Sequence, residues 1–289
     1  MTNEPVLPRS DARSLDEVLT AAEARWSRHV ETLDWQPGYR IRGPEDPFTA
    51  VQEYGHHAHW QEYAASHLRA YLDRTERPAP IEDANAQNDA WAVEDATLSH
   101  EVARARAAAA RETYIALARQ VGRTDERFIS NVAWNLVGHF DQHFGYMVAG
   151  MLAHESAGWE RLTAILDARP EGALHRGEDG VAWDATMVYA HLGRWMEIQF
   201  PRVEAFLATG EVPEDLGGTV DELNARWMAE DAALTFSEAR RRTFLARDRF
   251  VRMVYDLPIE RWTSRVVGLC MGNSAGHYQE HLDWIGRSG

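Results

Sequence analysis

The chain has 289 residues, and its 45 acidic residues against 30 basic residues give a formal net charge of −15. Nucleic acids and anionic membranes bind basic surfaces, so we expect neither as a partner. The sequence contains no lysine. This excludes lysine Schiff-base chemistry and the lysine of a phosphate-binding loop.

The cysteine content and the N-terminus indicate the cellular compartment. Cys270 is the single cysteine, which excludes a disulfide within the chain and favours a reducing environment. The N-terminus lacks the apolar segment of a signal peptide, and the apolar runs are too short to cross a bilayer. We therefore expect a cytoplasmic protein in which Cys270 is a small buried side chain, with a catalytic thiol as the alternative.

Almost every long segment has the composition and periodicity of a helix. The capping box Ser14-x-x-Glu17 begins the first helix, Pro37 follows its end, and Asp46-Pro47 begins the second helix. No segment shows the sustained alternation of a strand. The predicted helices span, in chain order, residues 14–35, 47–72, 90–121, 128–151, 155–168, 183–208, 219–255 and 272–285.

Four helices in each half predict an all-α fold of two tandem four-helix bundles, residues 1–150 and 151–289. Each half is close to the commonest domain size and can bury its own core. The join near residues 150–158 is short and compatible with a helix. We therefore expect the two bundles to dock as an internal pseudo-dimer, and the chain to be a monomer in solution.

The two halves repeat the same motifs in the same order. An early motif, Tyr-x-His-x-x-x-Trp-x-Glu, begins at Tyr54 and again at Tyr189. A late motif, Asn-x-x-Gly-His-x-x-x-His, begins at Asn135 and again at Asn273. Because weaker matches between these motifs keep the same order, the chain is a duplication of one domain.

Each copy supplies three histidines that could bind one metal ion. Residues four apart lie on one face of a helix, so the late motif places two imidazoles side by side. The histidine of the early motif, on a facing helix, would complete a tri-histidine site that leaves coordination positions open. The plainer alternative is a helix face with ordinary hydrogen-bonded histidines. The candidate ligands are His56, His139 and His143 in the first copy, and His191, His277 and His281 in the second.

The other histidines have no counterpart in the opposite copy. The repeat favours His56 as the ligand from the second helix, but His59, one helical turn later, stays open as a rival. We expect the unmatched histidines to be surface or ordinary packed residues, namely His29, His57, His59, His67, His100, His154 and His175.

Residues close to the histidines are candidates for catalysis and ligand binding. Tyr54 and Tyr189 could donate to a bound oxyanion, or could be packed tyrosines with satisfied hydroxyls. Glu280 aligns with Gln142, so it could be a general base in the second copy only, or simply a solvated acid. The indoles that could line a pocket above the metal, or simply fill the core, are Trp60, Trp91, Trp195 and Trp227. Two acidic pairs, Glu94-Asp95 and Glu230-Asp231, are expected to cap or buttress the third helix of each copy. The lesser alternative is that one of their carboxylates accepts a hydrogen bond from a ligand histidine.

One histidine on the second helix and His-x-x-x-His on the fourth resemble the DinB-like superfamily of four-helix-bundle metalloproteins. The resemblance covers about residues 14–285, as a tandem pair. It implies a divalent metal as cofactor, zinc first, with nickel or iron as alternatives.

The resemblance also implies a class of reaction. Members of the superfamily include S-transferases that use low-molecular-weight thiols such as mycothiol or bacillithiol, and a mycothiol-dependent maleylpyruvate isomerase. We therefore expect a metal-dependent transferase or isomerase that acts on a small electrophilic molecule with a thiol as cosubstrate. That isomerase has a glutamate where this chain has the first histidine of the late motif, so its reaction does not carry over directly. The alternatives are a metal-dependent hydrolase, a toxin-resistance protein and a non-catalytic metal-binding protein.

Overall fold

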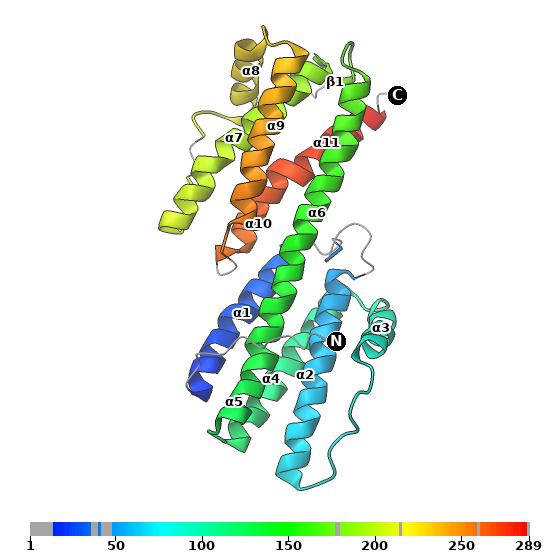
Figure 1. Ribbon diagram of the computed structural model, residues 1–289, viewed down its shortest axis with the longest axis vertical. Coiled ribbons are helices and arrows are strands. Elements are labelled where there is room, and N and C mark those ends of the chain that lie inside the picture. Colours follow the sequence, from blue (N-terminus) through cyan, green and yellow to red (C-terminus); the bar gives the residue numbers. More distant parts are fainter. Residues whose placement is uncertain are drawn as a thin grey trace, which may run out of the picture. The chain divides into compact units, whose positions relative to one another are not determined.

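The computed structural model shows an all-α fold, as the helical periodicity predicts (Figure 1). Contacts within the chain divide it into two compact units, Met1–Gly150 and Met151–Gly289, which are described separately below. No helix among the described residues is long and apolar enough to cross a membrane. The structure describes residues 14–35, 40–41, 48–176, 180–213, 216–258 and 261–287.

Unit 1 consists of helices that begin at polar caps. Asp83, Ser99 and Asp125 each accept a hydrogen bond from a backbone N–H of the first turn that follows them. The elements are α1 (Leu15–Trp35), α2 (Ala50–Asp73), α3 (Ala84–Asp95), α4 (His100–Val121), α5 (Glu126–Ala133), the π-helical turn η1 (Trp134–Gly138) and the first part of α6 (His139–Ala168).

One helix predicted in unit 1 is wrong. The helix predicted over residues 90–121 is two helices, α3 and α4, because the Ser99 hydroxyl caps a new helix. The second helix begins at Ala50, after Thr49, whose backbone N–H donates to the Gln52 side chain. The predicted start at Pro47 lies outside the described residues.

The core of unit 1 lies between α1, α2, α4 and α5. Helix α4 turns a row of small side chains inward: Ala103, Ala107 and Ala110 are all buried. Their spacing of four and three residues places them on one helix face, and their size lets another helix approach closely. Leu136 in η1 is fully buried in this core, which fixes the start of α6.

Unit 2 repeats this arrangement. It contains the remainder of α6, the strands β1 (His175–Arg176) and β2 (Ala182–Trp183), α7 (Ala185–Thr209), α8 (Val220–Asp231), α9 (Phe236–Tyr255), α10 (Ser264–Met271), the π-helical turn η3 (Gly272–Gly276) and α11 (His277–Arg287). The single helix predicted over residues 219–255 is again two, because Thr235 forms a capping box with Glu238. The predicted break before residue 155 is absent, since α6 continues to Ala168.

A short hairpin precedes α7, although no strand was predicted. Its two strands have two residues each, with His175 opposite Trp183, which is too short for an alternating pattern to show. The Leu174 N–H donates to the Trp183 carbonyl at 2.7 Å. In unit 1 the Ile41 N–H donates to the Phe48 carbonyl at 2.8 Å in the same place before α2. The duplication therefore extends to this turn.

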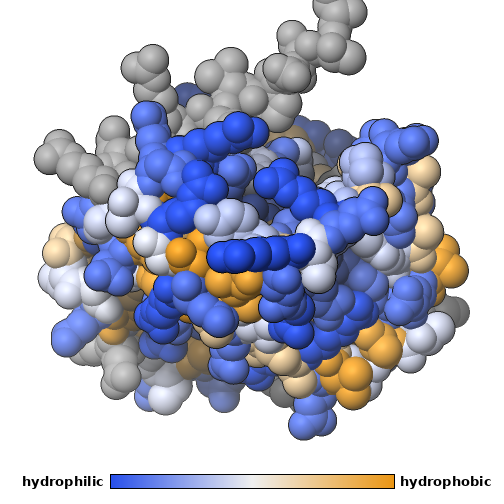
Figure 2. Space-filling model, turned by 90° about the horizontal axis from the view of Figure 1, so that it is seen from below, coloured by the Kyte–Doolittle hydropathy of each residue, from blue (hydrophilic) through white to orange (hydrophobic). Residues whose placement is uncertain are grey.

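One face of the molecule is largely polar. On the face shown in Figure 2, hydrophilic side chains predominate and hydrophobic ones lie in small groups between them. Docking of the two bundles as a pseudo-dimer, and a monomeric state in solution, stay predictions.

Candidate metal centres

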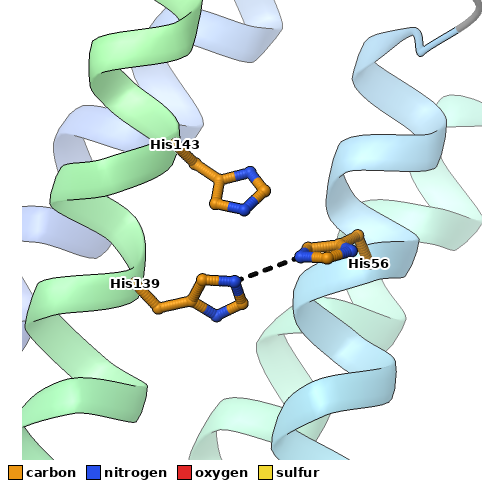
Figure 3. A group of neighbouring side chains, drawn as sticks. All are labelled: His56, His139 and His143. Carbon is orange, nitrogen blue, oxygen red and sulfur yellow. Dashed lines mark hydrogen bonds between the residues drawn. The ribbon is translucent and has the colours of Figure 1, made fainter. Parts of the chain in front are cut away.

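The three histidines predicted in unit 1 meet between two helices. His56 lies on α2, and His139 and His143 lie on α6, with one ring nitrogen of each within 4.8 Å of the others. His56 Nε2 and His139 Nε2 are 3.1 Å apart (Figure 3). His56 and His143 are buried, and His139 is partly exposed.

A π-helical turn directly precedes the histidine pair. The His139 N–H donates to the Trp134 carbonyl five residues earlier, the mark of this wider turn. Gly138 makes room for the Trp134 indole, since a Cβ there would lie 2.7 Å from Trp134 Cε3. That indole lies nearly parallel to the His139 ring, with centroids 6.0 Å apart. The missing side chain of Gly138 thus leaves room for the Trp134 indole of the same π-helical turn.

A buried carboxylate orients the third imidazole of unit 1. His143 Nδ1 is 2.7 Å from Glu53 Oε1, so Nδ1 carries the proton and donates it, and the Nε2 lone pair stays available. Burial favours a raised pKa for Glu53, but His143 and His57 outweigh it and hold the pKa well below its usual range. Glu53 therefore stays ionised beside the cluster.

Unit 2 brings together His191, His277 and His281 in the same way. Their ring nitrogens lie within 4.8 Å of one another, and His191 Nε2 is 2.9 Å from His277 Nε2. Here His281 Nδ1 contacts His175 Nε2 of β1 at 3.2 Å. His281 Nε2 is buried and makes no hydrogen bond to the described residues.

These imidazoles are suited to bind a cation. Burial lowers the pKa of His277 to about 4, and burial together with the neighbouring imidazoles lowers the pKa of His139, His191 and His281 well below the usual value. The rings are therefore neutral near pH 7 and offer lone pairs. Two nitrogens each about 2.0–2.1 Å from one ion lie about 3 Å apart, which matches the Nε2 pairs of both units. The residues present thus fit a divalent ion in each unit.

Each cluster lies against a pocket, and the two pockets differ in size. The unit 1 pocket has a volume of about 360 Å³, and that of unit 2 about 1000 Å³. Trp134 lines the first, whereas Gly272 stands at the equivalent place in the second, with open space where a Cβ would be. An indole beside the histidines therefore narrows the first pocket, and its absence widens the second.

Of the four indoles predicted to line a pocket, Trp60 and Trp195 do so, whereas Trp91 and Trp227 line neither of the two pockets. Trp60 lines the unit 1 pocket and donates to Asn88 Oδ1 at 2.9 Å; Trp195 lines the unit 2 pocket and donates to Asn224 Oδ1 at 3.0 Å. The hydrogen bonds hold both rings against asparagines that also line the pockets. Trp183, which also lines the unit 2 pocket, has a buried indole N–H without a hydrogen bond to the described residues.

The tyrosines predicted as oxyanion donors are engaged elsewhere. Tyr54 donates to Asp34 Oδ1 at 2.9 Å, and Tyr189 donates to Asp167 Oδ1 at 2.8 Å. Both rings are fully buried, and neither lines the pocket of its unit. Burial and the neighbouring carboxylate raise the pKa of both hydroxyls. Their geometry is that of packed tyrosines with satisfied hydroxyls, the second of the two sequence interpretations.

The acid predicted for the second copy lies at its pocket. Glu280 is exposed and lines the unit 2 pocket, and its counterpart Gln142 lines the unit 1 pocket and donates to the Tyr146 hydroxyl at 2.8 Å. The two units therefore present different groups, one ionisable and one neutral, at the same place.

The rival ligand His59 belongs to a separate cluster. His59 Nε2 contacts Asp95 Oδ1 at 3.2 Å, its ring stacks on Trp91, and Arg106 contacts both of its nitrogens. His56, one turn earlier, is the α2 histidine that lies beside His139. Asp95 thus contacts His59 and Arg106 and none of the three clustered histidines of unit 1.

Sequence reasoning missed the residues that contact the third imidazole of each cluster. Glu53 aligns with Val188, and His175 has no histidine partner in unit 1, so comparison of the copies gave no signal for either. Asn88 and Asn224 do align and could have been found from the repeat. Cys270 is buried, and burial raises the pKa of its thiol to about 12, as for a packed side chain.

Comparisons with protein-family models, with curated proteins and with solved structures find no match to this chain.

Proposed function

We propose that the chain is a metal-dependent enzyme of the DinB-like kind, with a divalent ion, zinc first, held by the tri-histidine cluster of each unit. The observation that carries this proposal is the convergence of three imidazoles beside a pocket, in both copies. Three protein ligands that leave positions open at a pocket are typical of catalytic metal sites and unlike closed structural ones.

We further propose that unit 2 carries the reaction, with a low-molecular-weight thiol as cosubstrate and a small electrophilic molecule as substrate. Its pocket of about 1000 Å³ is large enough for both, whereas the 360 Å³ of unit 1 is at the low end for a small ligand. The chemistry that a divalent ion supplies there is Lewis acidity, which lowers the pKa of a thiol or water that it binds.

The residues of unit 2 have distinct roles in this proposal. Glu280, exposed at the pocket, accepts the proton that a thiol releases and passes it to solvent. The indole N–H of Trp183, which makes no hydrogen bond to the described residues, donates to a polar atom of the bound molecule. Trp195, held by Asn224, forms an apolar wall, and His175 keeps His281 in one orientation.

The test uses untagged protein, so that no added histidines bind metal. Metal content is measured on the purified chain, and the metal is then replaced by cobalt. If a thiol binds at an open position, small cellular thiols should produce a sulfur-to-cobalt charge-transfer band in the near ultraviolet. His281→Ala should abolish the band, and His143→Ala should leave most of it, because the smaller pocket admits less ligand.

His67→Ala is the matched control, since His67 lies on α2 outside both clusters, with its ring against Tyr63. It should change neither metal content nor the band. If metal is bound but no thiol gives a band, hydrolysis becomes the better proposal. If no metal is bound, the chain is not a metalloenzyme.

A further inference from the structure

Unit 1 contains a second group of potential ligands next to its tri-histidine cluster. His29 on α1 and Glu53 and His57 on α2 have ligand atoms within 4.8 Å of one another. Their exposed fractions are 1%, 1% and 0%. None of the three lines the unit 1 pocket. The group is therefore sealed from the pocket at which His56 and His139 lie.

The imidazoles of this group lack hydrogen bonds. Both ring nitrogens of His29 and both of His57 are buried without a hydrogen-bond partner among the described residues. Buried polar atoms are almost always paired, because burial removes their contact with water. His57 Nε2 lies 3.3 Å and His29 Nε2 lies 3.7 Å from Glu53 Oε1, close but without hydrogen-bond geometry.

The second copy shows that the fold does not need these polar residues. The positions equivalent to His29, Glu53 and His57 are occupied by leucine, valine and leucine, all fully buried in the core of unit 2. Polar side chains at three core positions lower the stability of the fold unless a hydrogen-bond partner or an ion pairs with them. The group is thus a special property of the first copy. The equivalent core residues are Leu162, Val188 and Leu192.

The buried acid of unit 2 shows how such a charge is paired elsewhere in the chain. Glu155 has an exposed fraction of 1%, with Arg247 at 2.6 Å and the Tyr278 hydroxyl at 3.0 Å. Glu53 differs, because its ion-pair contacts within the described part of the chain are all with imidazoles: His29, His57 and His143.

We propose that His29, Glu53 and His57 bind a second divalent cation in unit 1, of the zinc type, at a buried site apart from the pocket. Imidazole and carboxylate are zinc ligands, and a nitrogen and an oxygen each about 2.0–2.2 Å from one ion can lie 3.3 Å apart, as those of His57 and Glu53 do. The His57 ring is held by Phe140, with which it stacks at 4.1 Å and an angle of 1°.

Glu53 connects the two sites of unit 1. The oxygen that contacts His57 also contacts His143 Nδ1 of the tri-histidine cluster. The buried cation would therefore hold Glu53 in place, and Glu53 would hold His143. The unit 1 pocket does not open onto the buried group. An ion bound by this group should therefore exchange with a chelator more slowly than the ions at the pockets.

The experiment counts metal on the full chain. Metal-free protein is loaded with Zn²⁺ or Co²⁺ alone, passed through a desalting column and analysed for metal and protein. The double variant His29→Leu, His57→Leu introduces the residues of the second copy, so its core should stay packed. We expect three equivalents for the parent chain and two for this variant. The control is His59→Arg, which also follows the second copy, where Arg194 pairs with Asp231. It should keep three.

A second variant tests the buried site with its ligands intact. Substitution of His56, His139, His191 and His277 by alanine removes two ligands from each tri-histidine cluster, and one slowly exchanging equivalent should remain. Circular dichroism checks that each variant folds. The proposal is overturned if the parent and the leucine variant bind equal amounts, or if the alanine variant binds none. The buried site is measured as a difference of one metal equivalent between two proteins. Its failure can therefore be distinguished from a failure of the tri-histidine sites of the proposed function.

Discussion

At the scale of single residues, equivalent positions of the two copies divide into those that keep their contacts and those that change them. Tyr54 and Tyr189 both donate to an aspartate of the preceding helix, and Trp60 and Trp195 both donate to an asparagine. These contacts set the helix spacing in both units. Trp134 and Gly272, by contrast, give the pockets different volumes.

Replacement of Tyr189 by phenylalanine tests whether its hydroxyl has a role beyond packing. The variant should keep its metal content and its cobalt–thiol band, because the hydroxyl contacts Asp167 and not the pocket. Loss of this hydrogen bond should lower the free energy of unfolding by about 1–2 kcal/mol, measured by urea denaturation. A variant with normal metal content but no thiol chemistry would restore Tyr189 as a catalytic candidate.

Exchange of the two pocket residues tests the control of ligand size. Gly272→Trp should weaken thiol binding to the cobalt protein at least about tenfold, which corresponds to about 1.4 kcal/mol, while metal content stays constant. Trp134→Gly should instead create a second thiol-binding equivalent in unit 1. Titration of the charge-transfer band measures both. Equal affinities in all three proteins would show that pocket size does not limit binding.

At the scale of elements, the π-helical turns set the direction of the late-motif histidines. Both η1 and η3 directly precede the first histidine of a pair. A π turn contains one residue more than an α turn. The residues after it therefore point in other directions than they would in an uninterrupted α-helix of the same sequence. Such turns occur preferentially at functional sites, which agrees with their presence in both copies.

Insertion of one alanine after Ala275 in η3 should remove one metal equivalent. A residue added within a helical segment turns everything after it by about 100°, so His277 and His281 are rotated away from His191. Metal analysis should show the loss, and the far-ultraviolet circular dichroism should stay almost unchanged. Ala275→Gly, which keeps the length, is the control and should bind metal normally. Retention of metal by the insertion variant would show that η3 does not orient the pair.

The sequence predicted the long helices and both histidine clusters, because periodicity and internal repetition are local signals. It did not predict that Ser99 and Thr235 each begin a new helix, since the flanking segments are rich in helix-forming residues. The contacts of Glu53 and His175 were also missed. These residues reach the clusters through tertiary packing, and the opposite copy has a different residue at each place.

At the scale of the whole molecule, buried neutral histidines make stability depend on pH. Burial lowers the pKa of His277 from its ordinary value of 6.5 to about 4. The unfolded chain therefore binds a proton at a higher pH than the folded chain does. The contribution of this ring is complete above pH 6.5 and is lost as the pH falls towards 4.

Metal-free protein should accordingly become less stable on acidification from pH 7.5 to pH 5. His277 alone accounts for a decrease of roughly 2 kcal/mol in the free energy of unfolding over this range. Urea denaturation at both pH values measures the change, and His277→Leu should show a smaller one. A parent chain with equal stability at both pH values would contradict the burial of neutral rings.

The contrast between Trp134 and Gly272 also has an evolutionary consequence. The tryptophan codon TGG and the glycine codon GGG differ in one base, so a single point mutation can exchange the residue of a narrow pocket for that of a wide one. A lineage could thus gain or lose access for a bulky substrate in one step, with all six histidines untouched.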